Sequence, residues 1–237
     1  AKKHGIELKN PDYVQIHPTT FYTKKHEDRS FLISESVRGE GAKLLDKNMN
    51  RFVDELLPRD VLTGKIREQM KKDGTDFVWE DLRTIPRDEL VSHFPNIIEH
   101  CKEMGYDVFK EPIPVVPAQH YFMGGVKVNH HSRTSMECLY AVGETACNGV
   151  HGRNRLASNS LLESLVFAKR AAGQMAELGF VNDEIAAKKA ADSIDLADYS
   201  DEKAVEREYR KLAMEAIEGR TSAQDMNAES GVTYIQA

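Results

Sequence analysis

Two histidines and two arginines occupy positions where the backbone is constrained. His17 precedes a proline near the end of a predicted strand, and Arg59 follows a proline at the start of a predicted helix. His120 comes shortly after a proline-rich segment, and Arg155 lies in a loop that leads into a helix. Guanidinium groups bind carboxylates through two hydrogen bonds at once. Each residue taken singly is more often a solvated or structural residue, but together the four favour a site for a small dianionic molecule.

Glu144 is a separate candidate, which points to a nucleotide. It follows Gly143 after an apolar segment that predicts a buried strand. An acidic residue at the carboxyl end of a strand can accept a sugar hydroxyl, and the next helix offers free N–H groups to an anionic ring or phosphate. An ordinary strand–helix unit with a surface glutamate explains the same pattern equally well. Both interpretations stay open on the residues alone.

The first half of the chain predicts one strand followed by helices. Residues 13–22 predict a strand, and residues 30–38 predict a short helix that two glycines end. Residues 87–104 predict a helix that a proline interrupts. Residues 59–73 predict a helix that ends at Gly74. Its expected buried face consists of Val61, Leu62, Ile66 and Met70.

Strand patterns return in the second half. Residues 112–117 contain three prolines, so this segment must be extended, and we place a domain hinge there or just after it. Residues 126–128 predict a strand, and residues 139–142 predict a buried strand. The whole order therefore predicts an α+β fold, because strands and helices are mixed along the chain.

Two helices are expected after these strands. The first is capped by Ser158 or Asn159 and ends at Gly179. The second spans residues 201–218, where the composition has shifted to Ala, Asp, Glu and Lys. The expected buried residues are Leu161, Leu162, Leu165, Val166 and Ala172 in the first helix, and Val205, Tyr209, Leu212 and Ile217 in the second.

Composition excludes several classes of protein. The 237 residues are 41% hydrophobic, and 32 Lys+Arg against 38 Asp+Glu give a net charge of −6. This composition argues against a disordered chain and against a nucleic-acid-binding surface. No apolar run is long enough to span a bilayer. The chain has three cysteines, an odd number without a C-x-x-C pair, so we expect no disulfide framework, no metal site and a reducing cytoplasm.

The chain contains six motifs: Gln15–Thr19, Ser34–Ala42, Pro58–Asp60, His120–Val126, Ala141–Glu144 and His151–Glu163. In this order they resemble motifs of the succinate dehydrogenase/fumarate reductase flavoprotein family. The resemblance covers about residues 11–180, and it is weak over residues 183–237. Within the family, the sequence of the motif His151–Glu163 is similar to that of the L-aspartate-oxidising branch. Succinate dehydrogenases tend to have Arg-Leu-Gly-Ala-Asn-Ser-Leu-Leu at this place.

The resemblance implies a domain order. Residues 1–10 would end an FAD-binding segment, and residues 11–122 would form a mixed α/β capping domain. Residues 123–185 would be the returning part of the FAD-binding domain, and residues 186–237 the start of a C-terminal helical domain. The chain does not begin with Met and contains no Gly-x-Gly-x-x-Gly. We therefore expect it to be part of a longer polypeptide whose missing N-terminal part holds the AMP half of FAD.

The resemblance also implies roles for the site residues. Arg59 would be the proton donor and acceptor, with Glu35 and Arg38 as a relay. Arginine stays protonated in proteins and is a poor base, so either a partner such as Glu35 relays the proton or the main role of Arg59 is electrostatic. The implied substrate ligands are His17, Thr19, Ser34, His120 and Arg155. The implied FAD ligands are Glu144 and the N–H groups of Ser160 and Leu161.

The implied reaction transfers hydride from a small dicarboxylate, L-aspartate, to FAD and gives iminoaspartate. Oxygen or fumarate would reoxidise the flavin, and the product would feed quinolinate and NAD synthesis, with quinolinate synthase as a candidate partner. Ser34 stands where relatives often carry threonine, a change that keeps the hydroxyl. Two alternatives stay open: a fumarate reductase or succinate dehydrogenase flavoprotein subunit with an iron–sulfur partner, and an isolated non-catalytic module.

Overall fold

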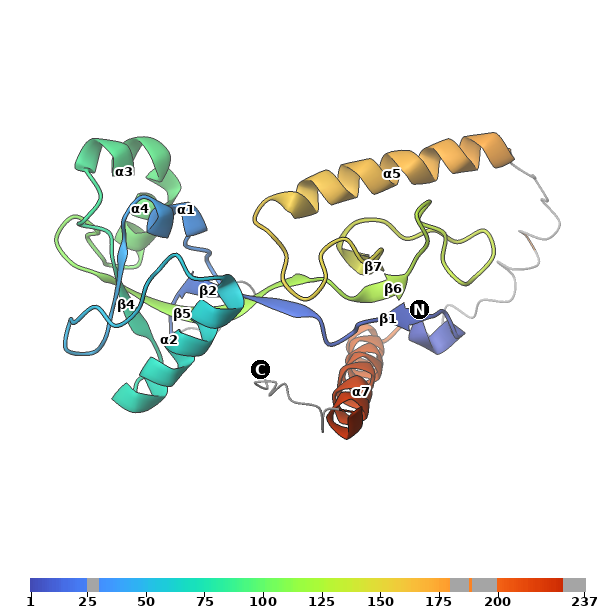
Figure 1. The fold of residues 1–237 in the computed structure, drawn as a ribbon, viewed down its shortest axis with the longest axis horizontal. Coiled ribbons are helices and arrows are strands. Elements are labelled where there is room, and N and C mark those ends of the chain that lie inside the picture. Colours follow the sequence, from blue (N-terminus) through green and yellow to red (C-terminus); the bar gives the residue numbers. More distant parts are fainter. Residues whose placement is uncertain (25–29, 180–187, 189–199, 228–237) are drawn as a thin grey trace. The chain divides into compact units, whose positions relative to one another are not determined.

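The fold was analysed in a computed structural model that describes residues 1–24, 30–179, 188 and 200–227 (Figure 1). The chain divides into two compact units. The first, unit 1, comprises Ala1–Val14 and Tyr121–Ala237, and the second, unit 2, comprises Gln15–His120. Both contain helices and sheet, so the predicted α+β class is confirmed. The predicted boundary at 185/186 lies outside the described residues.

Unit 2 is built on a four-stranded sheet with the order β2-β5-β4-β3. The strand β4 pairs antiparallel with β3 on one side and with β5 on the other. The proline-rich segment is extended, as predicted, and forms the start of β5. The strands are β2 (Val14–Phe21), β3 (Lys43–Leu45), β4 (Val78–Asp81) and β5 (Ile113–Phe122).

Four helices complete unit 2, and two of the predicted helical segments are confirmed. The predicted bounds of α2 hold, since Gly74 ends it in the left-handed conformation with φ 65°. The predicted break in the next segment also holds, because Pro95 starts a new helix after Phe94. The helices are α1 (Glu35–Gly39), α2 (Arg59–Asp73), α3 (Arg87–His93) and α4 (Pro95–Glu103).

Two details of unit 2 differ from the sequence prediction. The helix α1 begins at Glu35 rather than at residue 30, because Leu32 forms a β-bridge with Thr20 and is therefore held in an extended conformation. In α2, Leu62 and Ile66 are fully buried, but Val61 is exposed. Val61 and Leu62 are adjacent, so their side chains point about 100° apart around the helix axis, and only the side that carries Leu62 and Ile66 is covered. The core includes Leu44, Val78, Leu82 and Ile113.

Unit 1 contains a three-stranded sheet with the order β1-β6-β7, where β6 and β7 are parallel. Gly124 must be glycine here, because a Cβ atom would lie 1.8 Å from the carbonyl oxygen of Asn10. The predicted buried strand at 139–142 is wrong. Leu139 and Val142 are exposed, and the strand that pairs with β6 begins three residues after Gly143. The strands are β1 (Leu8–Lys9), β6 (Gly125–Lys127) and β7 (Ala146–Cys147).

The helix α5 (Asn159–Leu178) has the predicted ends, but its buried face differs from the prediction. Ser158 is the N-cap residue and Gly179 the C-cap residue, although Ser158 makes no capping hydrogen bond through its side chain. Its φ of 64° is left-handed rather than the extended conformation typical of an N-cap. The predicted core residues Leu161 and Leu165 are both 72% exposed. The predicted residues Leu162, Val166 and Ala172 are also exposed, and the buried residues are Glu163, Phe167 and Ala171.

The last described helix, α7 (Glu202–Asn227), contains the predicted segment 201–218 apart from its first residue and continues beyond it. The side chain of Asp201 starts it by accepting a hydrogen bond from the Ala204 N–H at 3.0 Å. Of the residues predicted to lie inward, Val205, Leu212 and Ile217 are half-buried and Tyr209 is exposed. The short helix η1 (Lys2–His4) contributes the ion pairs Lys2–Glu215 and Lys3–Glu208 to this unit.

Candidate active site

The strand β2 supplies three buried polar side chains to unit 2. Gln15, His17 and Thr19 alternate along the strand, so their side chains lie on the same face of the sheet. All three are almost completely buried. Buried polar groups need hydrogen-bond partners, and α1 and α2 provide them.

Arg38 of α1 holds the hydroxyl of Thr19. Its Nη1 donates to Thr19 Oγ1 at 2.5 Å, and this hydroxyl donates in turn to the carbonyl oxygen of Ile33 at 3.2 Å. The Nε of Arg38 donates to the Glu55 carbonyl oxygen at 3.3 Å. Burial lowers the pKa of Arg38 from its ordinary value, and the nearby carboxylates oppose this effect. Arg38 is therefore a buried cation with a fixed orientation.

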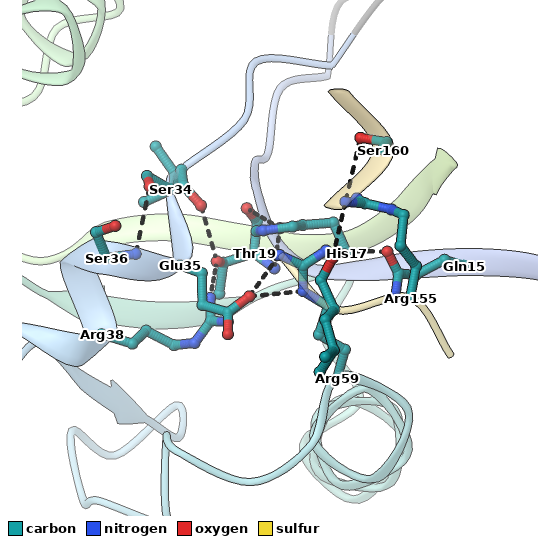
Figure 2. Close-up of polar contacts among 12 residues, drawn as sticks. Gln15, His17, Thr19, Ser34, Glu35, Ser36, Arg38, Arg59, Arg155 and Ser160 are labelled. Atoms are coloured by element: carbon teal, nitrogen blue, oxygen red, sulfur yellow. Dashed lines mark hydrogen bonds and ion pairs between the residues drawn. The ribbon is translucent and has the colours of Figure 1, made fainter. Parts of the chain in front are cut away.

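Arg59 at the start of α2 joins two elements (Figure 2). Its Nε and Nη2 lie 2.6 and 2.5 Å from Glu35 Oε2, and its Nη1 donates to Gln15 Oε1 at 2.9 Å. The Arg59 side chain is mostly buried, whereas the Glu35 side chain is 46% exposed. A charge-assisted pair of this kind is stronger than a neutral hydrogen bond. Glu35 thus connects a buried guanidinium to water.

His17 is a neutral imidazole in the middle of these cations. Its Nδ1 lies 2.9 Å from the Thr19 carbonyl oxygen and 3.2 Å from the Thr19 amide nitrogen. The ring of His120 meets it edge to face, with 5.2 Å between the centroids. Burial, followed by the charges of Arg38 and Arg59, lowers the pKa of His17 to about 2. His17 therefore offers hydrogen bonds without adding a charge.

Ser34 is the N-cap residue of α1. Its Oγ accepts a hydrogen bond from the Ser36 N–H at 3.3 Å, so it caps α1 and fixes the start of the helix that carries Glu35 and Arg38 (Figure 2). Of the predicted site residues in unit 2, the structure brings together His17, Thr19, Glu35, Arg38, Arg59 and His120. Gln15 was missed, although its alternation with His17 and Thr19 along the strand could have revealed it.

Arg155 lies in unit 1, in a polar cluster at the start of α5. It is almost completely buried, and its Nη1 donates to the Leu156 carbonyl oxygen at 3.2 Å and to Ser160 Oγ at 3.4 Å (Figure 2). Its guanidinium lies 4.6 Å from the centroid of the Tyr121 ring, which favours the cation. Contacts within unit 1 therefore fix the position of the Arg155 side chain.

Glu163 is a member of this cluster that sequence reasoning missed. Its Oε1 accepts from Asn148 Nδ2 at 2.5 Å, and its Oε2 lies 3.9 Å from His151 Nε2. Burial and the charge of Glu163 raise the pKa of Tyr121 to about 12, so the phenol stays protonated. The leucines around Glu163 predicted an apolar face, and only the fold shows that the glutamate is the buried residue.

Two of the residues predicted to bind FAD, Glu144 and Leu161, make hydrogen bonds within unit 1. Glu144 lies in the short helix η2 (Gly143–Thr145), and its Oε1 accepts from the Phe122 N–H at 2.9 Å. The Leu161 N–H donates to the Ser158 carbonyl oxygen at 3.2 Å. A carboxylate has about four acceptor positions, so Glu144 can still accept a sugar hydroxyl. The N-terminus of α5 suits the edge of a planar ring, because it offers N–H groups, and the exposed leucines beside it suit the face of the ring.

The described residues contain neither a cluster typical of a metal site nor a helix typical of a membrane span. Within the described ranges, no three His, Cys, Asp or Glu side chains come together as they would around a metal ion. None of the helices in those ranges is both long and apolar enough to cross a bilayer.

Comparison with known proteins identifies the class to which the chain belongs. Residues 1–161 match the FAD binding domain family. The fold is also similar to that of quinol fumarate reductase from E. coli, with a TM-score of 0.69 and 33% identity over 80% of this chain and 36% of that one. A second quinol fumarate reductase structure, with menaquinol molecules, gives a TM-score of 0.70 and 34% identity. The chain belongs to the FAD binding domain family, and the predicted resemblance to succinate dehydrogenase/fumarate reductase flavoproteins is confirmed.

The chain is also similar to several L-aspartate oxidases. The chain is 60% identical to that of Clostridium perfringens over 172 residues, which are 73% of this chain and 39% of the relative. It is 52% identical to that of Clostridium acetobutylicum over 172 residues, which are 40% of that protein. The L-aspartate oxidase of Nostoc is 50% identical over 182 residues. The chain thus spans about two fifths of the length of the two clostridial relatives.

Proposed function

We propose that this chain is the substrate-binding part of an FAD-dependent L-aspartate oxidase. The observation that carries the proposal is the buried network in which Arg59, Arg38 and neutral His17 lie together on one face of β2. Two guanidinium groups beside an uncharged hydrogen-bonding ring favour a negatively charged ligand over a neutral one. The relatives with 50–60% identity are named L-aspartate oxidase.

The chain's own residues have distinct parts in this proposal. His17, Ser34, His120 and Arg155 bind the two carboxylates and orient the Cα–H bond of the substrate. Thr19, which the resemblance also implied as a ligand, instead positions His17 and Arg38, because its hydroxyl already donates to the Ile33 carbonyl oxygen. Arg59 gives a guanidinium proton to Glu35, 2.5–2.6 Å away, as it takes a proton from the substrate, and the reverse transfer returns the proton. The exposed edge of Glu35 passes the proton to water. Because Arg59 stays cationic on average, it also stabilises negative charge that develops on the substrate.

FAD supplies the hydride acceptor when it is bound. Glu144 would accept a hydrogen bond from an FAD hydroxyl, and the N-terminal amides of α5 at Ser160 and Leu161 would face the flavin ring. The chain has no Gly-x-Gly-x-x-Gly loop for the phosphates. The activity is therefore proposed for what we call the complete flavoprotein, which is this chain joined to an N-terminal FAD-binding segment. The units would then act as the capping domain and as part of the FAD-binding domain.

Fumarate reduction by a flavoprotein subunit is the second candidate function. The structural similarity to quinol fumarate reductases favours this function. However, the chain is only 33–34% identical to these reductases, compared with 60% to the L-aspartate oxidase of Clostridium perfringens. Quinolinate synthase would receive the oxidase product and is the partner we propose for the first function. The three cysteines that are free in the structure suit a reducing compartment, and we propose the cytoplasm.

The proposal is tested by turnover of the complete flavoprotein with L-aspartate in air. We expect one hydrogen peroxide per iminoaspartate formed, because oxygen takes the two electrons from the reduced flavin. Peroxide formation should stop when FAD is removed and return when it is added. Absence of turnover in the FAD-loaded protein would favour the non-catalytic module.

A further inference from the structure

Glu163 is a buried acid that the proposed chemistry does not use. It lies in the second turn of α5, and its side chain is only 2% exposed, although the neighbouring Leu161, Leu162 and Leu165 are exposed. Burying a carboxylate costs free energy unless other groups hold it. The groups that surround Glu163 therefore show what its burial achieves.

One oxygen of Glu163 binds the loop between β7 and α5, residues 148–158. Asn148 Nδ2 donates to Glu163 Oε1 at 2.5 Å, and Asn148 Oδ1 accepts from the Val150 N–H at 3.0 Å. These loop residues form neither helix nor strand. Because such a loop lacks the hydrogen-bond ladder of a regular element, side-chain contacts have to fix it. Glu163 thus holds the start of the loop that carries Arg155.

The other oxygen of Glu163 meets an imidazole of the same loop. Glu163 Oε2 lies 3.9 Å from His151 Nε2, and both side chains are buried. This distance is too long for a hydrogen bond, so the carboxylate limits the position of the ring by packing against it. The ring is uncharged near neutral pH, because burial lowers the pKa of His151. Glu163 therefore contacts two side chains of the loop, one with each oxygen.

His151 connects this contact to Arg155 through Tyr121. The rings of His151 and Tyr121 meet edge to face at 89°, with 5.8 Å between their centroids. The guanidinium of Arg155 lies 4.6 Å from the centroid of the same Tyr121 ring. A ring face attracts a cation, and a guanidinium that lies over it has its plane set by the ring. The orientation of Arg155 thus depends on Tyr121, which His151 holds in turn.

We propose that Glu163 is a positioning residue that fixes the Arg155 guanidinium through Asn148 and through the rings of His151 and Tyr121. All five residues belong to unit 1. A guanidinium binds a carboxylate best through two parallel hydrogen bonds, so its orientation decides the affinity. The consequence for dicarboxylate binding rests on the proposed function, in which Arg155 binds a substrate carboxylate. The dependence of the Arg155 orientation on Glu163 does not.

The first experiment measures the Kd of malonate, a dicarboxylate that cannot be desaturated, from flavin spectral shifts of the complete flavoprotein. Glu163→Leu should raise the Kd about tenfold. Glu163→Gln should raise it less than about threefold, because its amide oxygen can still accept from Asn148. Glu177→Gln is the matched control, since Glu177 is an exposed glutamate of the same helix, and it should leave the Kd unchanged.

A double-mutant cycle shows whether Glu163 acts through Arg155. In an Arg155→Leu background, Glu163→Leu should raise the Kd by less than about twofold more, because the residue through which it acts is already gone. Full loss of affinity from each substitution, independent of the other, would overturn the proposal. It would assign Glu163 a general structural role instead.

The second experiment needs no ligand. It follows the side-chain Nε–H resonance of Arg155 by NMR in the complete flavoprotein with isotope-labelled arginine, and the peak is assigned by its loss in Arg155→Lys. Glu163→Leu should shift this resonance, and so should Asn148→Ala, which removes the hydrogen bond without changing α5. Glu177→Gln should leave it in place.

The NMR result decides the proposal even where one variant does not fold. An Arg155 resonance that stays in place in folded Glu163→Leu, or in Asn148→Ala if the leucine variant does not fold, would overturn it. Failure of the wild type to bind malonate would instead contradict the proposed function, and the NMR result would still decide whether Glu163 positions Arg155.

Discussion

Arg59 and Glu35 form an ion pair in which two guanidinium nitrogens, Nε and Nη2, approach the same carboxylate oxygen, Oε2, at 2.6 and 2.5 Å. The arginine is buried and the glutamate is half-exposed, so the pair runs from the interior of unit 2 to water. Gln15 occupies the remaining Nη1 of Arg59 at 2.9 Å. The guanidinium is therefore held by α1 and β2 together, and its orientation does not depend on a bound substrate.

The first prediction separates binding from proton transfer in the complete flavoprotein. Arg155→Leu removes a partner for a substrate carboxylate, and a charged hydrogen bond contributes about 1.5–3 kcal/mol. At about 1.4 kcal/mol per decade, we expect dicarboxylate binding to weaken by about one to two orders of magnitude. Arg59→Leu should instead lower the reductive rate far more than the affinity, because its role is realised in the transition state.

Flavin spectral shifts measure binding in these variants, and stopped flow measures the rate. Lys65→Leu is a matched control, because Lys65 is also a cation on α2 but pairs with Glu68 at 3.1 Å on the surface. Equal losses of affinity in the two arginine variants, with equal rates at saturation, would show that the division of roles is wrong.

The second prediction concerns the charge of His17. Its pKa in the folded chain is about 2, below the ordinary value of 6.5, so the unfolded chain binds more protons between these values. This group therefore contributes stability that is present above pH 6.5 and is lost as the pH falls. In NMR spectra, the His17 ring should stay neutral from pH 8 to 4. His93 is an internal control, because Glu40 at 2.9 Å raises its pKa and it should become charged. Protonation of His17 near pH 6 would contradict the account.

The third prediction concerns the stability contribution of Glu80, which has the opposite sign. Its folded pKa of about 7 lies above the ordinary value of 4.5, so the folded chain binds the proton more tightly. This contribution to the free energy of unfolding should fall by about 3 kcal/mol as the pH rises from 4.5 to above 7, at about 1.4 kcal/mol per pKa unit. Urea unfolding of wild type and Glu80→Leu at several pH values isolates it. Parallel stability curves for the two proteins would show that Glu80 ionises normally.

The fourth prediction is that the 237-residue chain alone does not retain FAD. It offers Glu144 and one helix end but no Gly-rich loop for the phosphates. The chain purified from cells should therefore show no stoichiometric flavin absorbance, and FAD added to it should be lost on gel filtration. A stable yellow protein with one FAD per chain would contradict this division of the cofactor site.

Local signals predicted the ends of two helices well. The helix α2 was predictable to the residue, because Pro58 starts it and Gly74 ends it in a left-handed turn. The ends of α5 were predictable for similar reasons. The site residues of unit 2 were also largely predictable, because the motifs that contain His17, Glu35, Arg38 and Arg59 are distinctive in residue type and order.

Features that depend on distant contacts were not predictable. The apolar residues 139–142 resemble a strand, but β6 pairs with Ala146 and Cys147 instead. The leucines of α5 predict its buried face, although Glu163 is the residue that finds buried polar partners. Glu80 sits in the run Val-Trp-Glu-Asp, where an acid is expected to face water. Its burial follows from the pairing of β4 with β3 on one side and β5 on the other, which no local pattern reveals.

The most direct test of the central claim is anaerobic reduction of the flavin in the complete flavoprotein, followed by stopped-flow absorbance. L-aspartate and succinate are offered separately at equal saturating concentrations. If the chain is the substrate-binding part of an L-aspartate oxidase, L-aspartate should bleach the flavin at least tenfold faster than succinate. Faster bleaching by succinate would contradict the account and would assign the chain to a succinate dehydrogenase or fumarate reductase flavoprotein.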